Sequence, residues 1–358
     1  MNLELTEGKI CHDSVASSGA DSIALGTFES TGRQRLIGLI LALSALGPQA
    51  CAPITSQPTL GNGGTVFATQ PSSTVFAIIG DYGYSPQTRK RNGQPAIDPP
   101  GDVARLVKSW EPDFIVTTGD NNYDCGEAES IDDNIGQYYH AFISPYVGRY
   151  GRGATENKFF PAMGNHDWYA GGGCQPNSSA APYLSYFSLA GNGRYYQFVR
   201  GAVHIFVLNS DVGSEPDGVS ESSIQATWLQ SALASSQSRW KLVVFHHPPY
   251  SSGMCCGGIG LESPWMRWPF QAWGASAVVS GHSHSYERIM IGGFPYFVNG
   301  AGGSGTTSFA LIAVSGTEVR FNDDMGAMRV IADQAAITFE FITRSGELID
   351  FFKLTAVE

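Results

Sequence analysis

The sequence predicts an α/β fold in which parallel and antiparallel strands are mixed. Three observations support this prediction: short apolar runs typical of buried parallel strands, helical segments between them, and two pairs of strands joined by short turns. The apolar runs cover residues 76–79, 114–116, 159–163, 242–245 and 277–279.

Two segments between these runs have apolar residues at the spacing of a helix. The first set is Val103, Leu106, Val107 and Trp110. The second set is Ile224, Trp228, Leu229 and Ala232. Helices therefore alternate with buried strands.

Antiparallel pairs are expected at two places. Residues 195–199 and 203–208 flank Arg200-Gly201, and residues 336–342 and 348–354 flank a turn at 344–346. Each pair predicts a hairpin. Four aromatic residues further along have near-helical spacing, which predicts a place in the core rather than at a substrate pocket. They are Trp265, Trp268, Phe270 and Trp273.

Composition and charge limit the class of protein. The chain has 358 residues, 42% of them hydrophobic, and a formal net charge of -11. Residues 1–52 are expected to be a leader, 53–73 a flexible linker and 74–358 one catalytic domain. The negative charge argues against nucleic acid or an anionic membrane as a partner. Small phosphorylated substrates remain compatible, because bound cations reverse the local field.

The leader resembles a secretory signal. Arg33 and Arg35 precede an apolar stretch at 36–46, which is too short to span a bilayer. A secreted, periplasmic or cell-envelope location is therefore expected. Three interpretations stay open: cleavage near residues 50–52, lipidation at Cys51, and a buried N-terminal helix.

Four cysteines lie outside the leader. Cys125 and Cys174 each follow a metal motif by a few residues, so they are expected to meet at one rim and to pair. Adjacent Cys255 and Cys256 are expected to be free or separately paired, because a bridge between neighbours is strained.

Each apolar run is followed by a side chain of the kind that binds metals. Carboxylates suit hard cations and imidazoles suit iron, zinc or manganese, so a mixed set predicts transition metals. Six ligands are too many for one four-coordinate ion and predict two ions, with Asp120 as the bridge. The six are Asp81, Asp120, Asn165, His246, His282 and His284.

Three further histidines need an interpretation. His140 and His204 lie outside any motif and are expected to be structural. His247 follows His246, and neighbours on a strand point in opposite directions, so His247 is not expected to bind a metal ion. It is expected to lie beside the ligands or to face the substrate.

The motifs resemble those of the calcineurin-like metallophosphoesterase superfamily. In chain order they are Asp81-Tyr82-Gly83, Gly119-Asp120-Asn121-Asn122-Tyr123, Gly164-Asn165-His166-Asp167, Val243-Val244-Phe245-His246 and Gly281-His282-Ser283-His284. Within it the chain is similar to purple acid phosphatases, because Tyr123 ends the second motif and Gly83 stands where many other members have a histidine ligand. The resemblance runs from about residue 74 to the C-terminus and implies a two-sheet β-sandwich flanked by helices (αββα). It matches a compact form without the fibronectin-like domain of the large plant enzymes.

The resemblance also implies the metal ligands. Ferric iron at the first site would be held by Asp81, Asp120, Tyr123 and His284. Zinc, manganese or ferrous iron at the second would be held by Asp120, Asn165, His246 and His282. His166 would stabilise the transition state or protonate the leaving alcohol, with Asp167 holding its ring. Asp167 departs from the glutamate that many purple acid phosphatases have there.

The predicted activity is hydrolysis of phosphate monoesters by attack of a metal-activated water, as in acid phosphatases. Two alternatives stay open. One is a phosphodiesterase of the same superfamily, decided by the loops at 84–100 and 254–269. The other is a metal-containing binding or envelope protein that has lost catalysis.

Overall fold

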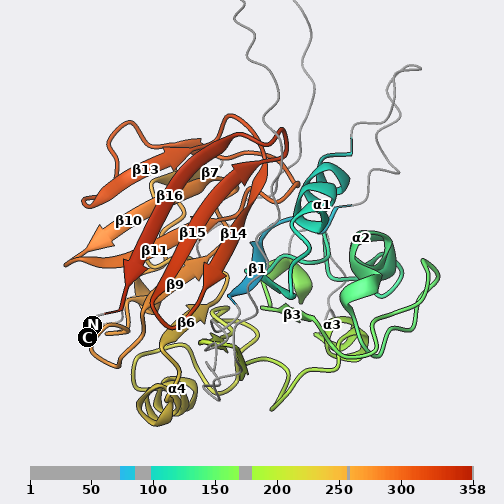
Figure 1. Cartoon of the computed structure of the whole chain (residues 1–358), viewed down its shortest axis with the longest axis horizontal. Helices are drawn as coiled ribbons and strands as arrows, with labels where there is room; N and C mark the ends of the chain where they lie inside the picture. The colour runs from blue at the N-terminus through green and yellow to red at the C-terminus, as the bar shows by residue number, and fades with distance from the viewer. Residues whose placement is uncertain (1–72, 85–97, 169–179, 256–258, 357–358) are drawn as a thin grey trace, which may run out of the picture. The chain divides into compact units, whose positions relative to one another are not determined.

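Two β-sheets pack face to face in the computed structural model, and helices lie against their outer faces (Figure 1). The structure describes residues 73–84, 98–168, 180–255 and 259–356. This arrangement confirms the predicted αββα sandwich with mixed strand directions.

The first sheet has six strands in the order β16-β15-β14-β1-β2-β3. Its parallel part consists of β1 (Thr74–Ile79), β2 (Phe114–Thr117) and β3 (Phe159–Pro161). Its antiparallel part consists of β14 (Gly326–Ala332), β15 (Ala336–Thr343) and β16 (Leu348–Thr355). Strands β15 and β16 are the hairpin predicted near the C-terminus.

The second sheet has seven strands in the order β13-β10-β11-β9-β6-β5-β4. Parallel pairing joins β5 (Val203–Val207), β6 (Trp240–Val244), β9 (Ala277–Ser280) and β11 (Phe294–Asn299). Antiparallel pairing adds β4 (Tyr196–Arg200), β10 (Tyr286–Ile291) and β13 (Thr317–Phe321). Strands β4 and β5 form the other predicted hairpin.

Helices and a small third sheet complete the described part of the fold. The two predicted helices are α1 (Pro99–Ser109) and α4 (Ile224–Ser235), and the shorter helices are α2 (Gln137–Tyr139) and α3 (Ala181–Tyr186). The small sheet joins β12 (Ser308–Phe309), β7 (Gly253–Cys255) and β8 (Ile259–Gly260). Single turns of 3-10 helix lie at Asn165–Asp167 and Pro264–Met266, among others.

Burial on both faces explains why the central strands are continuous apolar runs. In β1, Phe76 and Ile78 pack between the two sheets, whereas Ala77 and Ile79 pack in the layer that contains α1. In β6, Leu242 lies between the sheets and Val243 packs in the layer of α4. Side chains alternate along a strand, so both alternating sets must be apolar when both faces are covered.

Several predictions lie outside the described residues: the leader, nearly all of the linker, Cys174, Cys256 and most of the loop at 84–100. Within the described part, no helix is long and apolar enough to cross a membrane. Of the aromatic set, Trp268 and Phe270 are buried core residues, as predicted. Trp265 is 40% exposed, so the prediction that it belongs to the core is wrong.

Candidate metal centre

The predicted ligands follow the carboxyl ends of central strands from both sheets. Asp81, Asp120 and Asn165 come after β1, β2 and β3, and His246 and His282 come after β6 and β9. Parallel strands present these ends at one edge of a sheet. The two sheets are hydrogen-bonded to each other at this edge. For example, Nδ2 of Asn299 in β11 donates to the Ile78 carbonyl in β1 at 2.9 Å. Residues from five separate chain segments therefore meet at one place.

Three of the four predicted ligands of the first ion surround the phenol oxygen of the fourth, Tyr123. This oxygen lies 2.9 Å from Oδ2 of Asp120, 3.1 Å from Nε2 of His284 and 3.4 Å from Oδ1 of Asp81. Donor atoms about 3 Å apart suit one ion with bonds of about 2 Å. Oxygen donors with a single imidazole form this group, and a hard ferric ion fits such a set.

Three of the four predicted ligands of the second ion surround Nε2 of the fourth, His246. This nitrogen lies 3.0 Å from Oδ1 of Asn165, 3.2 Å from Nδ1 of His282 and 3.3 Å from Oδ2 of Asp120. Nδ1 of His246 is 3.0 Å from the Thr118 carbonyl oxygen, which can only accept. Nδ1 therefore donates, and Nε2 keeps a lone pair that suits a metal ion.

Asp120 belongs to both groups, as its predicted role as a bridge requires. Its Oδ2 atom contacts the Tyr123 phenol of the first group and the His246 ring of the second. Its Oδ1 atom accepts a hydrogen bond of 2.9 Å from the backbone N–H of His166. That bond orients the carboxylate and leaves Oδ2 toward both candidate sites.

The backbone is strained at three of these ligands. The φ angles are 56° at Asp81, 52° at Asp120 and 68° at His282, values that cost a residue with a side chain about 1–3 kcal/mol each. Glycines let other backbone segments come close: a Cβ atom on Gly164 would lie 2.2 Å from Oδ1 of Asp120. Such strain concentrates where function requires a specific geometry.

The buried charged side chains of the site favour the binding of a cation. Burial raises the pKa of Asp81 well above its usual range, and the neighbouring Asp120 carboxylate adds to this effect. Burial also acts against the charge of Asp120, but His246 and His166 hold the Asp120 pKa well below its usual range. Burial opposes a charge on His246, yet Asp120 raises the His246 pKa to about 9. A buried positive charge is therefore favoured between the carboxylates, and metal ions would supply it.

Tyr123 needs a cation to act as a ligand. Burial, together with Asp120 and Asp81, raises the pKa of its phenol well above the ordinary value. A bound ion reverses this effect, because metal coordination stabilises the deprotonated ligand. The donor set thus fits two metal ions, with an iron-type site at Tyr123.

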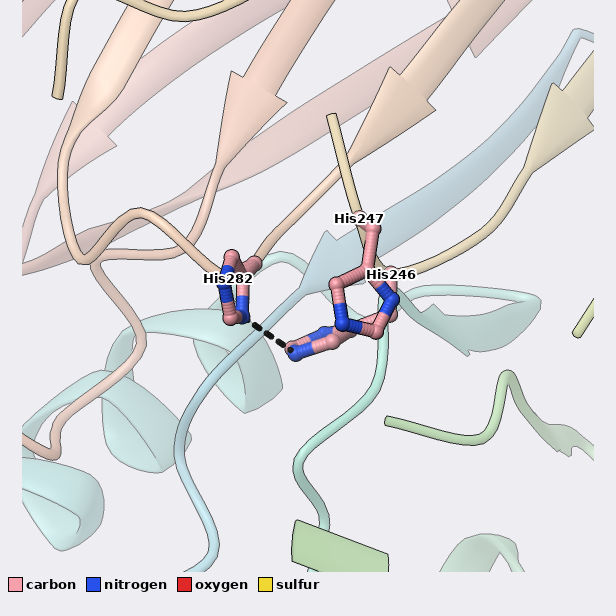
Figure 2. Close-up of side chains that lie close together, drawn as sticks. All are labelled: His246, His247 and His282. Carbon is pink, nitrogen blue, oxygen red and sulfur yellow. Dashed lines mark hydrogen bonds between the residues drawn. The ribbon is translucent and has the colours of Figure 1, made fainter. Parts of the chain in front are cut away.

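His247 lies beside the second group, which is one of the two places expected for it. Figure 2 shows its ring next to those of His246 and His282. The three imidazoles each offer a nitrogen atom, and these nitrogens lie within 4.8 Å of one another. Strand alternation does not apply here, because β6 ends at Val244. Ring nitrogen Nδ1 of His247 lies 3.0 Å from Oγ of Ser210, which leaves Nε2 available.

His166 lies beside the first group, but its ring is not held by Asp167 as predicted. Its ring packs on Tyr123 with centroids 4.4 Å apart, and its Nδ1 lies 2.6 Å from the Asp124 carbonyl oxygen. The buried Asp167 carboxylate instead accepts hydrogen bonds from Asn121 and from the backbone of Gly164. The prediction that Asp167 holds the ring of His166 is therefore wrong. Asp167 organises the turn that carries both Asn165 and His166.

The close approach of the second motif leaves no room for a histidine side chain at Gly83. A Cβ atom on Gly83 would lie 2.1 Å from the backbone carbon and oxygen of Asn121. No side chain fits there without moving that backbone. The Gly83 carbonyl accepts a hydrogen bond of 2.8 Å from the N–H of Tyr123, which positions the phenol.

Two other predictions concern residues away from the ligands. His140 bonds the Gly136 carbonyl and His204 bonds the Ser236 hydroxyl, in agreement with structural roles. Cys125 is disulfide-bonded. Its predicted partner, Cys174, lies outside the described residues, so the pairing stays a prediction.

Comparisons with known proteins identify the family. The model of the calcineurin-like phosphoesterase family matches residues 74–286, more than half of the chain. Purple acid phosphatase 3 of Arabidopsis thaliana is 24% identical over 317 residues, covering 81% of each chain. Tartrate-resistant acid phosphatase type 5 of Rattus norvegicus is 26% identical over 264 residues, covering 65% of this chain and 74% of its own. An uncharacterised protein of Mycobacterium tuberculosis is 28% identical over 211 residues, and this chain spans only 37% of its length.

Solved structures share the fold. A purple acid phosphatase from yellow lupin (Lupinus luteus) seeds matches with a TM-score of 0.62 and 20% identity, over 80% of this chain and 54% of its own. The Plasmodium protein GAP50, described as the anchor in the inner membrane complex, matches with a TM-score of 0.56 and 17% identity. The match covers 80% of this chain and 90% of GAP50. Fold, ligand order and family match agree: the chain belongs to the calcineurin-like phosphoesterase family and has purple acid phosphatases among its relatives.

Proposed function

We propose that the protein hydrolyses phosphate monoesters at a two-metal centre, in the manner of an acid phosphatase. The observation that carries the proposal is the shared position of Asp120 Oδ2, 2.9 Å from the Tyr123 oxygen and 3.3 Å from His246 Nε2. Two ions on either side of this atom would supply an activated water and would neutralise the phosphate. Ferric iron at the Tyr123 group and zinc, manganese or ferrous iron at the other are part of the proposal.

The residues around the ions complete the proposed chemistry. His166 lies on Tyr123 and is partly exposed, so it is placed to donate a hydrogen bond to the phosphate or a proton to the leaving alcohol. Its ring is oriented by the Asp124 carbonyl. No side-chain nucleophile would be required, because bound metal ions would activate a water molecule for the attack.

The test compares a monoester with its diester. The purified protein is loaded with ferric iron and zinc, and 4-nitrophenyl phosphate is compared with bis(4-nitrophenyl) phosphate from acid to alkaline pH. We expect a higher kcat/KM for the monoester and an acid pH optimum. Asp120→Asn should abolish this activity. A preference for the diester would favour a phosphodiesterase.

A protein that binds both metals and hydrolyses neither ester would instead be a binding or envelope protein. GAP50 is described as an anchor, so the fold alone does not decide. The full set of converging donors in this chain favours catalysis. Export is a further part of the proposal and rests on the signal-like segment at 36–46. Fractionation of cells that express the full chain tests it.

A further inference from the structure

We propose that a wall of rings beside the second metal group selects phosphate esters whose leaving group carries an aromatic ring. The wall consists of His247 and Trp265, and it is supported by Ser210 and Trp168. The inference rests on the proposed phosphatase function and adds a substrate class to it.

The rings form a continuous path from a predicted metal ligand toward solvent. The His247 ring centroid lies 4.6 Å from that of His282, at an interplanar angle of 45°. The Trp265 ring follows, 6.0 Å from His247. His247 is 8% exposed and Trp265 is 40% exposed, so the path begins in the buried site and ends at the surface.

Hydrogen bonds to Ser210 hold both rings of the wall. The Ser210 hydroxyl accepts from the backbone N–H of His247 at 2.9 Å and lies 3.0 Å from Nδ1 of the same residue. The Ser210 carbonyl accepts from Nε1 of Trp265 at 3.1 Å. Ser210 itself is completely buried. Because one buried residue bonds both rings, the wall is built in advance of binding.

The loop that carries Ser210 is also supported from its other side. A Cβ atom on Gly213 would lie 3.4 Å from the ring of Trp168, which follows the third ligand motif directly. In the same loop, the Asp211 carboxylate accepts hydrogen bonds from the backbone of Gly213 and Ser214. Its negative charge is therefore hydrogen-bonded within the loop. Val212, which precedes Gly213 in this loop, is 65% exposed.

The contrast with neighbouring residues points to binding rather than core packing. Trp268 and Phe270, from the same segment as Trp265, are 2% and 0% exposed. Trp265 alone of the three is substantially exposed, and it lies beside His247. A phosphate held at the metal group would place its ester substituent along these rings. Aromatic pairs add about 0.5–1.5 kcal/mol beyond area burial, equivalent to roughly 2- to 12-fold in affinity.

Phosphonates test the wall without requiring hydrolysis, because their P–C bond has no ester oxygen to release. Binding of phenylphosphonate and methylphosphonate to the metal-loaded protein is measured by calorimetry. We expect phenylphosphonate to bind roughly 3- to 10-fold more tightly. Trp265→Ala should bring the affinities for the two phosphonates to within about 2-fold of each other. Trp265→Phe should retain the preference for phenylphosphonate, because a ring remains. Phe351→Ala, which removes a 52% exposed ring on the edge strand β16, is the matched control.

Three outcomes would overturn the proposed wall, and a fourth would separate it from the phosphatase function. A wild-type ratio near one, or a ratio that survives in Trp265→Ala, would show that the rings do not select. If Trp265→Ala weakened methylphosphonate equally, Trp265 would only position Ser210 and His247. A protein that shows the predicted ratio yet hydrolyses no ester would keep the wall and contradict the phosphatase function. Where hydrolysis occurs, kcat/KM for phenyl phosphate should fall more than that for glycerol phosphate in Trp265→Ala.

Discussion

The phenol oxygen of Tyr123 lies 2.9 Å from Oδ2 of Asp120, the oxygen that also contacts His246. Without a cation, this proximity disfavours the phenolate, and the pKa of Tyr123 is raised well above its usual value. With a ferric ion between them, the same proximity provides two anionic ligands. The role of Tyr123 therefore depends on the ion.

Tyr123→Phe should remove the visible charge-transfer absorption of the iron-loaded protein and weaken iron binding at least about 10-fold. Phenylalanine retains the ring that packs on His166, so the fold should persist. Absorption spectra and metal analysis measure both effects. Tyr296→Phe, at a buried tyrosine of β11, is the control and should change neither. A band that persists in Tyr123→Phe would exclude the phenolate as its source.

His166→Ala should lower kcat by about 100-fold for an alkyl phosphate and much less for 4-nitrophenyl phosphate. A good leaving group needs no proton, so the difference isolates proton donation from binding. His140→Ala serves as the control, because His140 bonds the Gly136 carbonyl, packs on Tyr146 and lies outside every ligand motif. Equal losses with both substrates would assign His166 to phosphate binding instead.

Metal removal should lower the free energy of unfolding by about 3 kcal/mol or more for a tightly bound ion, since the ion binds only the folded chain. Urea unfolding with and without chelator measures this loss. Asp81→Asn should destabilise the loaded protein but change the metal-free protein by less than about 1 kcal/mol. The reason is that burial already raises the Asp81 pKa well above its usual range. A similar effect in both states would argue against an ion at Asp81.

Gly83→Ala should destabilise the protein by about 3 kcal/mol and abolish activity, because the added atom would lie 2.1 Å from the Asn121 backbone. Gly260→Ala is the matched control, since a Cβ atom there meets nothing within 4 Å. The control should cost under about 0.5 kcal/mol. Thermal and urea unfolding compare the two. A stable, active Gly83→Ala variant would show that the second motif can move.

Asp167 should make the stability of the metal-free protein depend on pH. Burial, together with Asp120, raises its pKa to about 7, against about 3.9 in an unfolded chain. Between these values the folded chain holds a proton that the unfolded chain releases, so stability decreases as pH rises from about 4 to 7. Asp167→Asn should abolish this pH-dependent decrease, which amounts to a few kcal/mol in the free energy of unfolding. Urea unfolding near pH 4.5 and pH 7.5 checks this, and an unchanged pH dependence would mean that Asp167 is ionised throughout.

The division of the candidate ligands between two metal groups rested on the family resemblance, whereas sequence patterns alone predicted the fold class and the order of the strands that carry candidate ligands. These follow from local patterns: runs buried on both faces must be apolar, and parallel strands end at one edge. Asp81, Asp120, Asn165, His246 and His282 were predictable because each follows the end of such a run within four residues.

Only the tertiary structure decided which partner each side chain bonds. Asp167 accepts from Asn121 rather than from His166, because the turn at Asn165–Asp167 lies against the second motif. His247 reaches His282 because β6 ends before it, and the indole of Trp265 bonds the distant Ser210. These contacts join segments far apart in the chain, and periodicity describes only which face is buried, not what lies opposite.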